Sequence, residues 1–279
     1  MPVVATNTAA NSALRYLNNN SSAATSSVSK LASGSRIVKA SDDAAGLAIG
    51  TRLKADVTAL TQAGINASQG ASVVQVADGG LSRIGDILQR MKALAAQSLS
   101  GVPTDTERGF IDAEFQELMS EIDDVATTTR FNGQSLLNGT AVAQDYFVGT
   151  DVADVINVDF GGLAAATADF RTSALGLVTG TDVGTAAAAG SAMALIDTAI
   201  DTISEARATA GALISRFEFR GQQIATSLEN IDAAKSAIMD VDLAAEQSKL
   251  VSSQVLVQAA VSAVSQANQI PQSLLRVLQ

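Results

Sequence analysis

The sequence predicts a mainly α-helical fold: an elongated antiparallel helical bundle or coiled coil formed by both chain ends, with a small β-hairpin in the middle. Apolar residues recur at heptad spacing in both halves of the chain, and a turn-rich stretch separates these halves. Composition agrees, because 47% of the 279 residues are hydrophobic while only 4% are aromatic. We therefore expect thin, closely packed helices rather than a wide core.

The first predicted helix ends at Ser33-Gly34-Ser35, because Gly readily adopts the left-handed backbone that closes many helices. Steps of four and three along this helix give one stripe, made of Ala10, Leu14, Leu17, Ser21, Ala24, Val28 and Leu31. Its larger members, predicted to form a coiled-coil seam, are Leu14, Leu17, Val28 and Leu31.

The second predicted helix begins after Ser41-Asp42-Asp43, whose side chains can accept hydrogen bonds from the first free N–H groups, and ends at Gly101-Val102-Pro103. At about 1.5 Å per residue it would be about 85 Å long. Its apolar stripe consists of Val74, Ala77, Leu81, Ile84, Leu88, Met91 and Ala95. Gly79-Gly80 interrupts the stripe, and we interpret it as close helix packing or a soft point in a long rod, since no strand precedes it as in a phosphate-binding loop.

Two more segments complete the predicted bundle. Thr104 to Thr129 carries apolar residues at helical spacing and is expected to fold back antiparallel to the second helix. Ala194 to Ile238 is the candidate for a fourth helix that closes the bundle. The residues predicted to pack in this bundle are Leu81, Ile84, Leu88 and Met91, together with Ile200, Ile203, Phe217, Ile224 and Leu228.

The heptad pattern changes phase near Asp240, which predicts a skip or kink, and then continues to a boundary before Pro271. The seam residues predicted for this last helix are Leu243, Leu250, Val257 and Val264. The expected divisions of the chain are residues 1–40, 41–192, 193–240 and 241–279.

The middle of the chain has a different character. Asp145–Gly149 and Val155–Phe160 are predicted to form a hairpin, because they are rich in β-forming residues and turn sequences surround them. The Ala-, Thr- and Gly-rich stretch from Ala164 to Gly190 has little to bury, and we expect it to be an exposed connection.

Composition excludes several functional classes. The chain has no cysteine and no histidine, which removes the commonest nucleophiles, general bases and metal ligands, so we expect no enzyme and no cofactor. A net charge of −10 opposes binding to nucleic acid. The paired carboxylates Asp42-Asp43, Asp123-Asp124 and Asp240-Val-Asp242 are interpreted as helix caps rather than metal ligands. We find neither a cleavable signal sequence nor a run of about 18 uncharged apolar residues, so we expect no membrane insertion.

Several runs resemble one family, the bacterial flagellins. They are Leu31–Ile49, Ile87–Gln97, Thr129–Gly139, Arg216–Glu218 and Gln266–Gln272. The resemblance implies a short flagellin without large outer domains, whose paired ends form an inner coil and whose remaining helices form a rod. It implies a structural subunit that self-polymerises into the extracellular flagellar filament for swimming motility. The implied partners are further copies of the chain, flagellar cap and hook-junction proteins, an export chaperone and the type III export apparatus.

Two surface sites are also implied. By resemblance, Gln89, Arg90, Leu94 and Glu114 match the surface that the vertebrate flagellin receptor reads. Residues of the middle stretch that are candidates for O-linked sugars, as in some flagellins, are Thr167, Thr172, Ser173 and Thr181.

Two alternatives remain open at this stage. A hook-filament junction protein shares the terminal coils but usually lacks the full run from Asp42 to Ile49. A discrete coiled-coil adaptor would form a small closed oligomer instead of an open-ended polymer.

Overall fold

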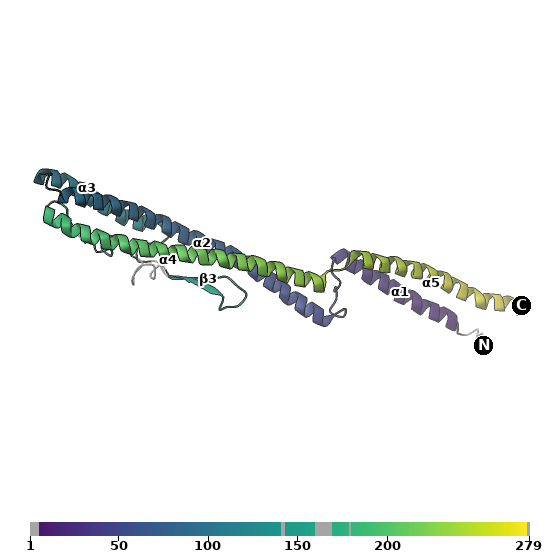
Figure 1. The fold of residues 1–279 in the computed structure, drawn as a ribbon. Helices are drawn as coiled ribbons and strands as arrows, with labels where there is room; N and C mark the ends of the chain where they lie inside the picture. Colours follow the sequence, from purple (N-terminus) through teal and green to yellow (C-terminus); the bar gives the residue numbers. More distant parts are fainter. Residues whose placement is uncertain (1–5, 141–142, 160–168, 179, 278–279) are drawn as a thin grey trace. The chain divides into compact units, whose positions relative to one another are not determined.

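The computed structural model describes residues 6–140, 143–159, 169–178 and 180–277, with side chains described as far as residue 269. Within these residues the protein contains five helices and two pairs of short antiparallel strands, which confirms the mainly α prediction (Figure 1). The helices are α1 (Thr8–Ser33), α2 (Ala44–Leu99), α3 (Asp105–Thr128), α4 (Ala186–Met239) and α5 (Leu243–Val277). The strands are β1 (Arg130–Phe131), β2 (Gln134–Ser135), β3 (Gln144–Phe147) and β4 (Val155–Val158).

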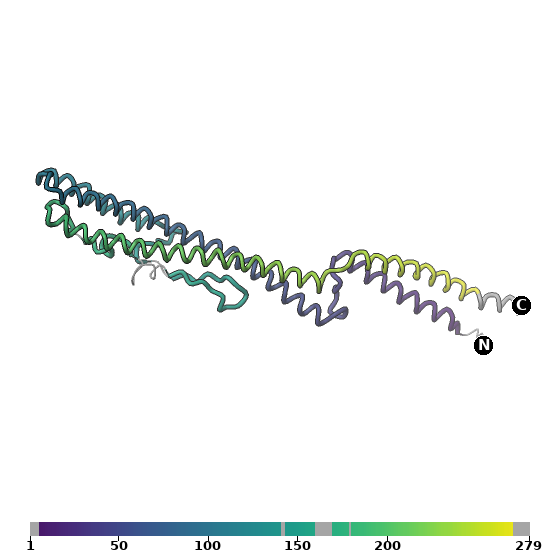
Figure 2. Tube along the Cα trace, in the orientation of Figure 1, coloured from purple at the N-terminus to yellow at the C-terminus, as the bar shows by residue number. Residues whose placement is uncertain are grey.

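The chain divides into two compact units, and both halves of the sequence contribute to each. Unit 1 combines residues 1–57 with residues 230–279, and unit 2 consists of residues 58–229. In unit 1 the first and last helices, α1 and α5, lie side by side, as the matching heptad patterns predicted (Figure 2). The unit boundaries lie inside α2 and α4, whereas the sequence placed its divisions at breaks between helices.

Local side chains define the helix ends, as predicted. Gly34 has a φ of 70° and ends α1, and its N–H donates to the Lys30 carbonyl. Asp43 Oδ1 accepts a 2.8 Å hydrogen bond from the Gly46 N–H at the start of α2. Each bond satisfies a backbone group that a helix end leaves unpaired.

A reciprocal capping box starts α3. The Thr104 hydroxyl accepts from the Glu107 N–H, and the Glu107 carboxylate accepts from the Thr104 N–H at 2.7 Å. The Thr104 N–H, followed by its hydroxyl, holds the pKa of Glu107 below its ordinary value.

The predicted break near Asp240 is present, because α4 ends at Met239 and α5 begins at Leu243. Residues 34–36 and 238–241 meet at this break, and we call these two segments the clasp.

Backbone and side-chain hydrogen bonds hold the clasp. The Arg36 N–H donates to the Met239 carbonyl at 2.8 Å, and the Val241 N–H donates to the Gly34 carbonyl at 3.1 Å. The Ser35 hydroxyl adds a 2.9 Å bond to the Met239 carbonyl. The N-terminal half of the chain thus satisfies carbonyl groups at the end of a helix from the C-terminal half.

In unit 2, α2 and α4 run antiparallel and approach closely. Three glycines of α2 face large side chains of α4: the pairs are Gly64 with Ile224, Gly70 with Phe217, and Gly85 with Ile203. The stripe predicted on α2 is wholly buried and comprises Val74, Ala77, Leu81, Ile84, Leu88, Met91 and Ala95. Gly80 packs against Leu137 and Thr129, which supports the close-packing interpretation at that position, whereas a Cβ added at Gly79 would meet nothing within 4 Å.

The two strand pairs follow α3. Strands β1 and β2 are joined by Asn132-Gly133, both with positive φ, a turn that suits a two-residue hairpin. The predicted hairpin is formed by β3 and β4. Tyr146 of β3 stacks edge-on against Phe217 at 5.6 Å, and the Asn66 amide donates to the Phe147 carbonyl, so this hairpin is attached to α2 and α4.

The prediction of an exposed connection is wrong for its described part. Phe170, Leu177 and Val183 are fully buried, although the stretch is poor in large apolar residues. Polar groups of α3 hold the segment, since Asp123 accepts a 2.7 Å bond from the Thr172 N–H and Asp112 accepts a 2.9 Å bond from the Val183 N–H. Sequence composition cannot reveal such docking, because the acceptors lie about 50 to 70 residues away along the chain.

Two helix boundaries also differ from the prediction. Helix α4 begins at Ala186 rather than Ala194, because the preceding alanines favour helix. Helix α5 continues through Pro271 to Val277. A proline removes one intrahelical donor, but here the helix continues past it.

Helix α4 and the part of α5 up to Gln269 are long and apolar enough to cross a membrane by length and composition, each with a window of mean hydropathy 1.2. The sequence prediction of no membrane span used a stricter criterion, an uninterrupted run of uncharged apolar residues, whereas this finding uses the mean hydropathy of a window. Core helices of soluble proteins meet the same criterion, and 28% of the α4 window is buried, so the finding is a weak indication of membrane insertion.

Candidate assembly surface

Helices α1 and α5 pack along one seam of small and apolar residues. On α5 the more buried positions follow the predicted heptad phase and are Glu246, Leu250, Ser253, Val257, Ala260, Val264 and Ala267. On α1 they are Ala10, Ala13, Leu17, Asn20, Ala24, Ser27 and Leu31. Leu17, Leu31, Leu250, Val257 and Val264 therefore lie where the sequence placed them.

Three predicted seam residues lie elsewhere. Leu14 and Val28 are about half exposed, at 48% and 50%, and Leu243 is 60% exposed. Ala13 and Ser27 occupy the more buried positions next to Leu14 and Val28. Small residues allow the two helix backbones to approach, so Leu14 and Val28 lie outside the buried seam.

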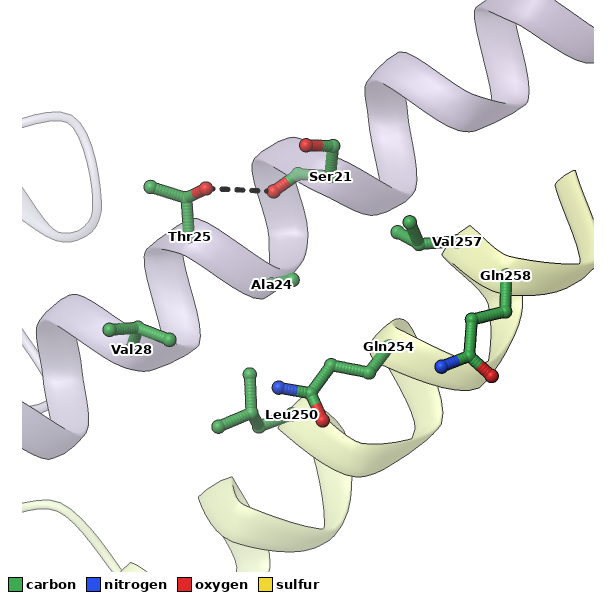
Figure 3. A pocket seen from close by; sticks show the side chains of 8 residues that line it. All are labelled: Ser21, Ala24, Thr25, Val28, Leu250, Gln254, Val257 and Gln258. Atoms are coloured by element: carbon green, nitrogen blue, oxygen red, sulfur yellow. Dashed lines mark hydrogen bonds between the residues drawn. The ribbon is translucent and has the colours of Figure 1, made fainter. Parts of the chain in front are cut away.

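A groove of about 410 Å³ lies between the two helices, next to this seam (Figure 3). It is lined by Ser21, Ala24, Thr25, Val28, Leu250, Gln254, Val257 and Gln258. Figure 3 shows Ala24 of α1 and Leu250 of α5 pointing toward the facing helix, with Val28 on α1 and Gln254, Val257 and Gln258 on α5 beside them. An apolar floor with hydroxyl and amide groups around it suits a helix as occupant.

Outward-facing apolar side chains continue beyond the groove. On α5 they are Val251, Val255, Leu256 and Val261, each about half exposed. Between Leu250 and Gln269 the helix carries no charged residue. Such a face is poorly suited to water and marks an interaction site.

One layer of the seam is polar. The Ser27 hydroxyl donates a 2.6 Å hydrogen bond to Glu246 Oε1, and Glu246 is only 6% exposed. Lys249 Nζ lies 3.3 Å from the other carboxylate oxygen. The bond from Ser27, together with Lys249, holds the pKa of Glu246 below its ordinary value despite burial.

Comparison with known proteins identifies the architecture. A model of the bacterial flagellin N-terminal helical region matches residues 4–142, and a model of the bacterial flagellin C-terminal helical region matches residues 193–278. The chain belongs to the bacterial flagellins. It is therefore a structural subunit of the flagellar filament.

Individual relatives of this flagellin agree over nearly their full length. The flagellin of Listeria monocytogenes is 37% identical over 271 residues, which cover 94% of each chain. The flagellin of Bacillus subtilis is 35% identical and covers 98% of each chain. A solved flagellar hook-associated protein from Vibrio parahaemolyticus shares the fold, with a TM-score of 0.58 and 14% identity over 71% of this chain and all of that one.

The residues predicted to pack in the rod of this flagellin are found in unit 2. Leu81, Ile84, Leu88, Met91, Ile203, Phe217 and Ile224 are buried, while Ile200 and Leu228 are half-buried. Ala199 and Ala206 occupy the buried positions next to Ile200 and Arg207. Arg207 instead points outward and pairs with Asp78 at 3.0 Å.

The predicted receptor surface is only partly a surface. Gln89, Arg90 and Glu114 are exposed, and Arg90 pairs with Glu114 at 2.6 Å. Leu94 is 2% exposed and belongs to the core of unit 2, so its inclusion in a surface was wrong. Resemblance alone could not distinguish the inward-facing member of this helical stretch.

The candidate glycosylation residues differ in access. Thr172 and Thr181 are buried, so the exposure on which their selection rested is missing. Ser173 is exposed, and Thr167 lies outside the described residues.

The carboxylates considered for metal binding have structural partners. Asp42 and Asp43 accept backbone N–H groups before and within the first turn of α2, and Asp242 accepts from the N–H groups of Ala244 and Ala245. Among the described residues, no three or more acidic side chains are grouped as metal ligands would be.

Proposed function

We propose that this flagellin polymerises through the α1–α5 pair, with the apolar face of one copy packing into the groove of another. The observation that carries the proposal is the position of apolar side chains outside the seam. Two helices whose seam is rich in Ala and Ser bury little apolar surface, and Val28, Val255 and Val261 remain about half exposed.

The absence of charge on α5 favours the apolar face of a second copy of the chain as the occupant of the groove. The uncharged stretch of α5 carries valines at spacings of four and six residues, such as Val251, Val255 and Val261, which line one broad side of a helix. That side matches the apolar floor of the groove, and the surrounding Gln and Thr side chains offer hydrogen bonds at its edges. Repeated along a helical array, such a contact is heterologous and open-ended.

The finer aspects of function follow the family. We propose that the filament is extracellular and serves swimming motility, that the subunit is exported by the type III apparatus with an export chaperone, and that cap and hook-junction proteins bind the filament ends. We propose no catalytic role. Gln89, Arg90 and Glu114 remain candidates for receptor recognition, and Ser173 for glycosylation.

Seeded polymerisation followed by electron microscopy tests the proposal. Val255→Lys should abolish filament growth, because it places a charge on the apolar face without touching the seam. Val152→Lys, which changes an exposed valine of unit 2, is the matched control and should still polymerise. Equal filament growth by both variants would show that this face of α5 is not an assembly surface.

A further inference from the structure

The seam between α1 and α5 does not by itself specify how the two helices are aligned. Leu17 and Leu31 recur on α1 at multiples of seven, and Leu250, Val257 and Val264 recur at seven on α5. A shift of one helix by a heptad would again place apolar residues opposite apolar residues. The alignment therefore requires other contacts.

Two polar contacts are made in the observed alignment, and the first of them joins two specific side chains. Ser27 bonds Glu246 at 2.6 Å, and the Asn7 side-chain amide donates to the Ala267 carbonyl at 2.8 Å. Ser27 lies 20 residues after Asn7, and Glu246 lies 21 residues before Ala267. Both contacts thus belong to the same antiparallel register.

The clasp contributes at one end of the pair only. Its side-chain bond from Arg36 Nε to the Ile238 carbonyl is exposed to water, which competes for such groups. Beyond the clasp, a local irregularity in either helix would be enough to shift the seam. Glu246 lies in the first buried layer past this point.

Glu246 is well suited to fix the register, because a buried carboxylate tolerates few neighbours. The groups that face it are Ser27 and Lys30 of α1 and Lys249 of its own helix. A shift by one heptad would place it opposite Gly34, which has no side chain, or opposite Asn20, whose uncharged amide would have to replace the Ser27 hydroxyl. A carboxylate buried without a partner is strongly unfavourable.

We propose that Glu246 determines the register of the α1–α5 pair by accepting the hydrogen bond from Ser27. The same register places Val28 and Ala24 of α1 beside Leu250 of α5 in the groove. Glu246 therefore acts as a positioning residue for the assembly surface. The role of Glu246 in positioning the assembly surface rests on the proposed function, whereas its role in fixing the register does not.

The absence of cysteine from the sequence allows the register to be measured directly. Cysteines at Ala13 and Ala260 should report the native register, because both are seam positions that the two polar contacts place opposite each other. Pairing Ala13→Cys with Ser253→Cys or Ala267→Cys should report shifts of one heptad in either direction. Disulfide yield after mild oxidation is read on filaments and on the soluble subunit.

In the parent chain we expect a cross-link at the native cysteine pair and none at the two shifted pairs. Glu246→Leu should raise the ratio of shifted to native product about tenfold or more, since a hydrogen bond to a charged group is worth about one decade or more in an equilibrium constant. Ser27→Ala should change the ratio in the same direction. Glu229→Leu, which replaces an exposed Glu of unit 2, should leave it unchanged.

Filaments that mix chains carrying a single cysteine each show how much cross-linking occurs between copies. This amount is subtracted from the yield of each double-cysteine chain. If the Glu246→Leu variant cross-links only at the native pair, the clasp is sufficient to fix the register and the proposal is wrong. If that variant does not fold, Ser27→Ala decides in the same way. Failure of the parent chain to polymerise would count against the proposed function, whereas the cross-links of the soluble subunit would still decide the register.

Discussion

Phe217 lies so close to Gly70 that a Cβ atom added at Gly70 would be 2.5 Å from the Phe217 ring atom Cζ. The two residues come from opposite halves of the chain and join α2 to α4 in unit 2. Tyr146 covers the same ring from the β3–β4 hairpin. This contact links α2, the β3–β4 hairpin and α4.

Gly70→Ala should therefore destabilise the protein by about 1–3 kcal/mol, because the Phe217 ring cannot move without disturbing its neighbours. Gly64→Ala is the matched control, since its added Cβ would lie 3.7 Å from Ile224. There the higher helix propensity of Ala should stabilise by about 1 kcal/mol. Urea unfolding followed by circular dichroism measures both, and equal stability of the two variants would contradict the proposed close approach.

The docking of residues 169–184 on α3 should depend on Asp123. Asp123→Ala leaves the Thr172 N–H and hydroxyl without their acceptor, and we expect a loss of about 2 kcal/mol. Asp124→Ala, at the exposed neighbouring position, should have little effect. Limited proteolysis should cleave the segment around Leu175 and Leu177 faster in the Asp123 variant only. Resistance equal to that of the parent chain would show that apolar burial alone holds the segment.

The capping box at α3 predicts a pH dependence. The pKa of Glu107 is lowered in the folded chain, so its ionised form stabilises the fold at pH values above its ordinary value of 4.5. This contribution is lost as the pH falls through the lower folded value. Glu107→Gln should flatten the acidic part of a plot of unfolding free energy against pH, measured by urea titration. Glu117→Gln, which changes an exposed Glu on the same helix, should leave the plot unchanged.

The exposed pair of Arg90 and Glu114 should contribute little to folding. Both side chains are about half exposed, and surface ion pairs are usually worth less than about 1 kcal/mol. Glu114→Ala should thus shift the unfolding midpoint only slightly. A large loss of stability would mean that this pair is structural, and any effect of the variant on receptor binding could not then be assigned to recognition.

The end of α1 and the starts of α2 and α3 could be predicted from the sequence, because each depends on residues a few positions away. Gly34, Asp43 and the Thr104–Glu107 pair act on backbone groups within four residues, so their chemistry can be identified without a partner. The stripe of α2 could be predicted for a related reason: all of its members are apolar, and they keep one spacing along a single helix.

Which of two neighbouring residues faces the partner helix could not be predicted in the same way. Counting apolar residues selected Leu14 on α1 and Ile200 on α4, whereas Ala13 and Ala199 take the more buried positions. Both choices keep heptad spacing, so the sequence alone does not separate them. The separation of the helix backbones decides between them, and small residues are selected where that separation is short.

By itself, then, the sequence determined the number and order of the helices and the pairing of the chain ends, because these follow from local periodicity and capping. The family followed separately, from the motifs that the chain shares with flagellins. Only the tertiary structure decided that Leu94 faces the core, that Thr172 is buried against Asp123, and that Ser27 meets Glu246. Each of these depends on groups tens or hundreds of residues away. Their positions are set by the packing of whole helices, which no local pattern contains.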